Sequence, residues 1–167
     1  MCEALTRIDP VPAEPVSLVG ATMALVPAVK RYNLRGPAAA LQAFVPVKLP
    51  AKIGDIADSE RALAVMLGPD EWLLIGAVAG DGIGHGVSIT EITERQIGLA
   101  IEGPRASALL MSGCPLDLER MPAGRGTRTI YETVEIVVIK RSETRFHIEV
   151  WRSFAPWLWA ALTVAGA

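Results

Sequence analysis

The chain has 167 residues, of which 51% are hydrophobic and 20% are charged, and its formal net charge at pH 7 is −2. Its pI is near 5.7 and its mean hydropathy is +0.36. This length suits one domain, or two small halves packed closely together. A slightly acidic chain has no global basic field, so we expect no nucleic-acid partner. The apolar excess suggests that part of the surface faces another protein.

The N-terminal region, residues 1–27, is rich in proline and predicts an extended arm that runs over a surface. Its first residues are acidic, unlike the positively charged start of a signal peptide, so we expect a cytoplasmic protein. Two apolar stretches, residues 16–29 and 154–167, are shorter than the roughly 20 residues needed to cross a bilayer. The sequence therefore predicts no membrane partner.

Metal chemistry is not indicated by the spacing of the potential ligands. The two cysteines, Cys2 and Cys114, are far apart, and only His85 and His147 accompany them. A zinc site needs closely spaced ligand pairs, so we predict no metal site. Cys114 is instead expected to be a small buried hydrophobic residue.

A strand, a Gly-Pro turn and a helix follow one another twice along the chain. The first set covers residues 30–35, Gly36-Pro37 and 38–44, and the second covers 96–102, Gly103-Pro104 and 105–112. This recurrence predicts a duplicated α+β chain, with residues 28–167 forming one domain from two pseudo-repeats, about 28–78 and 95–167. Residues 79–89 are rich in glycine and lack the Lys of a phosphate loop, so they are expected to join the halves.

Strand-like stretches follow each helix. Residues 64–76 contain a Pro-Asp turn, and residues 133–140 and 145–151 predict a hairpin. Strand alternation places His147 opposite the apolar face, where we expect it to be solvated. A second glycine cluster, residues 124–126, is expected to be a surface loop, with anion binding through Arg125 and Arg128 as the alternative.

The C-terminal residues S-F-A-P-W-L-W-A-A-L predict a helix that is apolar around nearly its whole circumference. Such a helix must be covered on more than one side, either by a partner or by a groove in its own sheet. The candidate interface residues are therefore Phe154, Trp157 and Trp159. Trp72 is a fourth candidate, with a role in the core as its alternative.

No catalytic constellation is visible. Asp70 and Glu71 are neighbours in sequence, so they cannot face one another as an acid/base pair, and they are interpreted as a turn and a strand entry. The serines have no neighbouring histidine and no G-x-S-x-G elbow. We predict no catalytic residue.

Three stretches together resemble one family: L-G-P-D-E-W-L-L from Leu67, E-G-P-R-A-S-A-L-L-M-S-G-C-P-L-D-L from Glu102, and E-V-W-R-S-F-A-P-W-L-W-A-A-L from Glu149. They are similar to the gamma subunit of heterotetrameric sarcosine oxidase. The resemblance extends from about residue 28 to the C-terminus, and G-C-P-L-D-L and R-S-F-A-x-x-L-W are its most specific parts.

The resemblance implies the fold of the folate-binding aminomethyltransferase domain of the glycine cleavage system, with two intertwined antiparallel β/α halves. It also implies a complex that oxidises sarcosine to glycine and passes the one-carbon unit to tetrahydrofolate. FAD, FMN and NAD would belong to the large alpha and beta subunits, beside a small delta subunit. This chain would be an accessory subunit that binds no cofactor itself.

Folate-using relatives carry an acid in a T-G-E-x-G-F-E-like hairpin, and the resemblance places Glu143 at that position. Ser142 and Arg145 replace both glycines and His147 replaces the final acid. A pterin must approach the backbone closely there, so we interpret Glu143 as a vestige of a folate site. A stand-alone tetrahydrofolate-dependent aminomethyltransferase and a homo-oligomeric interaction domain are the alternative functions.

Overall fold

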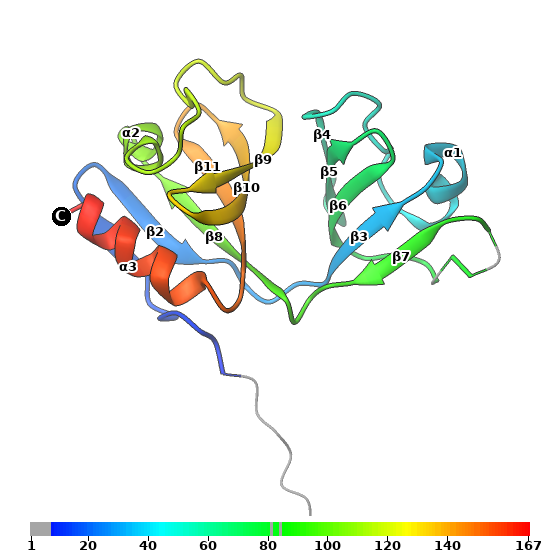
Figure 1. The fold of residues 1–167 in the computed structure, drawn as a ribbon, viewed down its shortest axis with the longest axis horizontal. Helices are drawn as coiled ribbons and strands as arrows, with labels where there is room; N and C mark the ends of the chain where they lie inside the picture. The colour runs from blue at the N-terminus through cyan, green and yellow to red at the C-terminus, as the bar shows by residue number, and fades with distance from the viewer. Residues whose placement is uncertain (1–7, 81, 84) are drawn as a thin grey trace, which may run out of the picture.

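The computed structural model describes residues 8–80, 82–83 and 85–167, which form two antiparallel sheets (Figure 1). The six-stranded sheet has the order β1-β2-β8-β11-β10-β9, and the five-stranded sheet has the order β4-β5-β6-β3-β7. The strands of the first are β1 (Val16–Leu18), β2 (Ala21–Leu25), β8 (Gln96–Glu102), β9 (Arg125–Tyr131), β10 (Val134–Ser142) and β11 (Arg145–Trp151). Those of the second are β3 (Arg31–Arg35), β4 (Ile56–Asp58), β5 (Ala62–Gly68), β6 (Glu71–Gly76) and β7 (Ser88–Glu91).

Each sheet places a tight hairpin beside the strand that leads into a Gly-Pro turn. In the five-stranded sheet, hairpin β5–β6 lies beside β3, and in the six-stranded sheet hairpin β10–β11 lies beside β8. The turn glycine donates its N–H to the tip of the adjacent hairpin in both, from Gly36 to Asp70 O (3.1 Å) and from Gly103 to Thr144 O (2.9 Å). The predicted strands, turns and hairpins therefore occupy corresponding places in the two sheets.

The N-terminal region differs from the predicted surface arm. Strands β1 and β2 pair with each other, and β2 also pairs with β8, so they extend the six-stranded sheet. Met23 is fully buried, because strand alternation turns it toward the core while Thr22 remains exposed. Residues 1–7 of the expected arm lie outside the described residues.

The helices cover the outer faces of the two sheets (Figure 1). Helix α1 (Ala38–Leu41) and the 3-10 turn η1 (Gln42–Phe44) pack on the five-stranded sheet, where Leu41 joins the core around Trp72. Helices α2 (Ala106–Met111) and α3 (Ala155–Ala165) lie on the six-stranded sheet and complete the largest core. Within the described residues, no helix combines the length and apolar character needed to cross a bilayer.

The inner faces of the two sheets share a third apolar cluster. Leu63, Val65, Leu73 and Ile75 from the five-stranded sheet meet Val137 and Ile139 from β10, and Ile92 closes the same cluster. The chain crosses between the sheets twice, and the crossings are joined by hydrogen bonds from Arg31 N to Thr93 Oγ1 (3.0 Å) and from Ile92 N to Arg31 O (2.8 Å). The inner faces are therefore held by a small core and a double connection.

Candidate functional site

Four arginine–carboxylate pairs connect the inner faces of the two sheets. They are Arg31–Glu149, Arg128–Glu71, Arg125–Asp55 and Arg141–Asp58. In each pair the arginine and the acid come from opposite halves of the structure. Guanidinium groups suit this role because their planar donors match carboxylate geometry. The polar groups between the sheets therefore mainly hold the two halves together.

The most deeply buried of these pairs also includes a histidine. Arg31 Nε donates to Glu149 Oε2 at 2.6 Å, and His147 Nε2 lies 2.7 Å from Glu149 Oε1. Burial acts to raise the pKa of Glu149, but the hydrogen bonds and charges of His147 and Arg31 outweigh it and hold that pKa below its ordinary value. Glu149 is therefore a buried carboxylate stabilised in its charged form.

Gly98 on β8 provides the space for this cluster. A Cβ at this position would lie 2.9 Å from Arg31 Nη2, Glu149 Oε1 and His147 Cε1. The cluster also corrects the prediction for His147, whose side chain is only 12% exposed. Alternation correctly placed His147 on the polar face of β11, but the second sheet covers that face.

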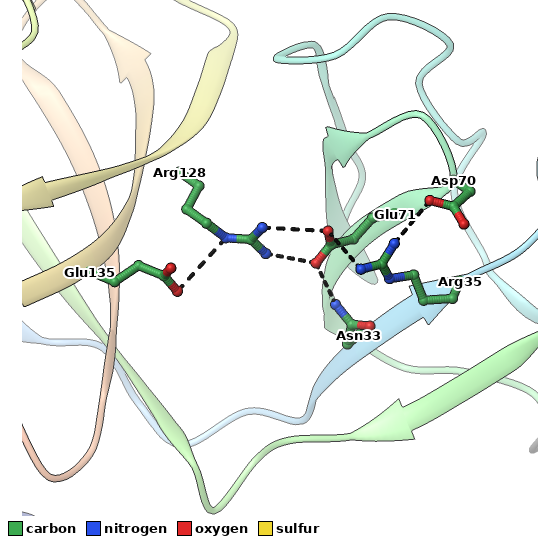
Figure 2. A network of polar contacts seen from close by, with 6 residues as sticks. All are labelled: Asn33, Arg35, Asp70, Glu71, Arg128 and Glu135. Atoms are coloured by element: carbon green, nitrogen blue, oxygen red, sulfur yellow. Dashed lines mark hydrogen bonds and ion pairs between the residues drawn. The ribbon is translucent and has the colours of Figure 1, made fainter.

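Asp70 and Glu71 do not form an acid pair, as the sequence predicted, but Glu71 has a role that the sequence did not show (Figure 2). Asp70 lies in the β5–β6 turn and accepts a hydrogen bond from Arg35 (2.9 Å). Glu71 accepts hydrogen bonds from Arg128 Nη2 (2.6 Å) and Asn33 Nδ2 (2.9 Å), and Arg35 Nη2 lies 3.3 Å away. Asp70 therefore belongs to the turn of the hairpin, whereas Glu71 connects the two sheets.

The charge of Glu71 is set mainly by its contact with the opposite sheet. The hydrogen bond from Arg128 lowers the pKa of Glu71, partial burial opposes this, and the contacts with Asn33 and Arg35 reinforce it. The net pKa lies below its ordinary value, while Glu71 raises the pKa of Arg128. On its other side Arg128 Nε is 3.8 Å from Glu135.

The hairpin that carries Glu143 borders a polar pocket of about 270 Å³. Its lining includes Ser142, Arg145 and His147 but not Glu143. The Glu143 side chain is 77% exposed at the β10–β11 turn and forms an ion pair with Lys140 Nζ at 3.1 Å. The acid at the folate-type position therefore points away from the enclosed space and is already paired.

The four aromatic interface candidates divide into two buried and two exposed residues. Trp72 is buried in the core of the five-stranded sheet and donates its indole N–H to Pro50 O (2.9 Å). Trp159 is buried with Leu158 and Leu162 on the inner side of α3. Neither residue can present its ring to a partner in this conformation. Trp72 is therefore a core residue, which was the alternative to an interface role, and one side of α3 is covered by its own sheet.

An aromatic patch remains on the surface around the start of α3. It consists of Trp151, Phe154 and Trp157, which are 38%, 46% and 40% exposed. The Trp151 and Phe154 rings are 6.4 Å apart, and Arg95 lies 4.8 Å from the centre of the Trp151 ring. Trp157 meets the buried ring of Tyr131 edge to face at 6.3 Å. These contacts hold the exposed rings in place.

Sequence reasoning missed strand β9, although it named two of its arginines, Arg125 and Arg128, as possible anion-binding residues. Residues 124–126 were expected to form a loop, but Arg125 begins a seven-residue strand and pairs with Asp55. The run R-G-T-R-T-I-Y has β-branched residues at alternate positions, which could have indicated the strand despite its glycine. Arg125 and Arg128 bind acids of the opposite sheet, so both are occupied.

Other predicted features can also be placed. Cys114 is buried as predicted, whereas Cys2 lies outside the described residues. The glycine-rich stretch does not join the two halves as expected, because it lies between β6 and β7 of the five-stranded sheet, and the chain passes to the other sheet only after β7. In this stretch, of which residues 81 and 84 are not described, the His85 ring lies edge to face with Phe44 at 5.3 Å. Among the residues described, His, Cys, Asp and Glu form no cluster of three or more that could hold a metal ion.

Comparison with solved structures first gives the class of fold. Glycine cleavage system aminomethyltransferase T from Bartonella henselae superimposes with a TM-score of 0.65 at 17% identity, over 87% of this chain and 46% of that one. This shows that the two-sheet arrangement is an aminomethyltransferase-like fold. Heterotetrameric sarcosine oxidase from Corynebacterium sp. U-96, solved with pyrrole 2-carboxylate, contains a more similar chain, with a TM-score of 0.75 and 26% identity over 93% of this chain and 90% of that one.

Sequence comparison identifies the family. The model of the sarcosine oxidase gamma subunit family matches residues 34–167, so the chain belongs to this family. Sarcosine oxidase subunit gamma from an Arthrobacter species is 28% identical, and that from Corynebacterium sp. strain U-96 is 29% identical, each over 66% of this chain. The chain spans about 60% of the length of these curated relatives.

Proposed function

We propose that this chain is an accessory, non-catalytic gamma subunit of a sarcosine oxidase complex. The complex would demethylate sarcosine oxidatively to glycine and pass the one-carbon unit to tetrahydrofolate, with FAD, FMN and NAD held by the alpha and beta subunits. The observation that carries this proposal is the structural match over 90% of a chain in a heterotetrameric sarcosine oxidase. The role of this chain would be to support assembly, in the cytoplasm.

The surface proposed to dock on a large subunit is the aromatic patch of Trp151, Phe154 and Trp157. Its rings are exposed yet positioned by Arg95 and Tyr131, so little side-chain freedom is lost on binding. Each ring is already more than half buried, so docking would remove only about 60–100 Å² of surface from it, which corresponds to about 2 kcal/mol per ring before the costs of association. Aromatic anchors of this kind commonly dominate protein interfaces.

Paired substitutions test the patch. Replacing Phe154 and Trp157 together by Ser should abolish copurification with the large subunits when they are coexpressed, while circular dichroism remains that of the wild type. Val164→Ser is the control, because Val164 is apolar and even more exposed, at 78%, but lies at the other end of α3. Retention of the double variant in the complex would refute docking through this patch.

We also propose that the two halves arose by duplication, with residues 28–167 forming one domain that β1 and β2 extend. The support is the shared chain order of strand, Gly-Pro turn, helix and hairpin, with the hairpin lying beside that strand in both sheets. A separate proposal concerns Glu143, which we interpret as a vestige that binds no folate, because its carboxylate is exposed and paired with Lys140. Calorimetry with tetrahydrofolate should give no binding heat, and a signal abolished by Glu143→Ala would overturn this.

A further inference from the structure

Four strands form the edges of the two sheets, and one of them is unusually long. Strands β1, β4 and β7 have 3, 3 and 4 residues, whereas β9 has 7. Exposed edges invite pairing with other chains, and proteins commonly protect them by keeping edge strands short. Arg125 and Gly126 already pair with residues 54 and 55, so the open part of this edge runs from Thr127 to Tyr131. This open part is still longer than the other three edge strands, which makes it the edge best suited to accept another strand.

The backbone of β9 presents hydrogen-bonding groups on this edge. Gly126 directs its N–H away from β10 and donates it to Gly54 O (2.9 Å). Outward groups recur at every second residue of an antiparallel strand, so those of Arg128 and Ile130 point the same way. Arg128 O accepts the hydroxyl of Thr127 (3.3 Å). Within the described part of the chain, the N–H of Arg128 and the N–H and C=O of Ile130 have no partner.

The side chains along the edge suit an uncharged, partly apolar occupant. Ile130 is 43% exposed. At the other end of the edge, Ile53 and Leu116 are exposed in a groove of about 440 Å³ that reaches Thr127. The two arginines of β9 are already paired with Asp55 and Glu71, so they leave no unpaired positive charge that would favour an acidic occupant. The edge thus offers free backbone groups between two apolar contact points.

We propose that the edge of β9 at Arg128 and Ile130 accepts an extended segment of another subunit of the complex by strand addition. The occupant would be uncharged where it passes the two arginines and would place apolar side chains beside Ile130 and the Ile53–Leu116 groove. Backbone hydrogen bonds would supply the affinity, and the apolar side chains of the occupant, which alternate along its strand, would supply the specificity. This inference rests on the proposed function, because it requires a partner subunit.

Amide hydrogen exchange on the full chain, free and within the coexpressed complex, tests the proposal directly. In the free chain the amides of Arg128 and Ile130 should exchange fast, while that of Thr129, which points toward β10, exchanges slowly. In the complex the first two should slow by at least about tenfold. A complex that forms while both amides keep exchanging at the free rate would overturn strand addition but leave the accessory role intact.

A proline substitution provides an independent test. Ile130→Pro removes an outward donor without breaking the ladder with β10, so the fold should tolerate it, as edge strands tolerate proline. It should weaken association with the other subunits by about tenfold or more. Ser17→Pro is the matched control on the opposite edge of the same sheet and should have no effect.

The remaining outcomes are also distinguishable. Unchanged association of Ile130→Pro would refute the proposal. Protection of the two amides in the isolated chain, together with a dimer mass by light scattering, would show that a second copy of this chain is the occupant and would equally overturn it. If neither the wild type nor Ser17→Pro associates with other subunits, the proposed function itself fails.

Discussion

Glu149 is the buried acid on which the contact between the two sheets depends most. Glu149→Gln would leave the Arg31 guanidinium buried without its counter-charge, and such losses commonly cost about 3–5 kcal/mol. Urea unfolding should therefore show a much lower free energy of unfolding. Glu135→Gln is the control, because Glu135 is half exposed and its closest contact is 3.8 Å, so its loss should change stability by less than about 1 kcal/mol. Equal effects of the two substitutions would contradict this assignment.

The acid sensitivity of the fold should depend on Glu71 and Glu149. Both have a folded-state pKa below the ordinary value of 4.5, so each stabilises the protein at neutral pH. This contribution is lost as the pH falls below about 4.5 and through the lower folded-state pKa, because protonation then accompanies unfolding. Denaturation between pH 7 and 3 should show this decline. The decline should be shallower in Glu71→Gln, and an identical slope would argue against the role of Glu71.

Truncating Trp72 should mainly reduce the stability of the fold, whereas truncating Trp157 should mainly reduce association with the other subunits. Trp72→Ala would remove a fully packed core ring and should cost ~3–5 kcal/mol, measured as a lower unfolding midpoint in urea. Trp157→Ala should cost about 1 kcal/mol or less, since its ring is 40% exposed and contacts mainly Tyr131. Trp157→Ala should, however, weaken association with the other subunits more than Trp72→Ala does. A folded, stable Trp72→Ala chain that fails to assemble would restore Trp72 as a docking residue.

At the scale of elements, the Gly-Pro turn between β8 and α2 depends on its glycine. Gly103 has φ +140°, and a Cβ there would overlap the carbonyl oxygen of Gly20. Gly103→Ala should cost about 1–3 kcal/mol from backbone strain, with a further loss from the overlap. Gly124→Ala is the control, since its φ is +81° but a Cβ would contact nothing within 4 Å. Thermal unfolding should rank Gly103→Ala clearly lower.

Elements with a local signal were predicted from the sequence, and elements defined by distant partners were not. The hairpin of β10 and β11, both Gly-Pro turns and α3 follow from alternation, turn residues and helical composition. Strands β1, β2 and β9 were missed or interpreted as arm and loop, because their prolines and glycines obscure a pattern that pairing completes. Similarly, alternation identified the polar face of His147 and Glu149, but only the second sheet explains why that face is buried.

At the scale of the whole molecule, the two sheets behave as one body because apolar contacts, ion pairs and two chain crossings join them. The arginine–carboxylate pairs link residues far apart in sequence, such as Arg31 and Glu149, so no local pattern could reveal them. The functional assignment likewise depended on motifs shared with a family and not on a visible site. What the fold leaves exposed, the aromatic patch and the edge of β9, is suited to partners.

The most direct test of the accessory role is affinity purification through a tag on this chain, followed by a sarcosine oxidation assay on the eluted material. The proposed role predicts that the chain elutes with larger, flavin-containing subunits, and that the eluate produces hydrogen peroxide when sarcosine is added. Elution of this chain alone and without flavin, while sarcosine oxidase activity stays in the unbound fraction, would contradict it.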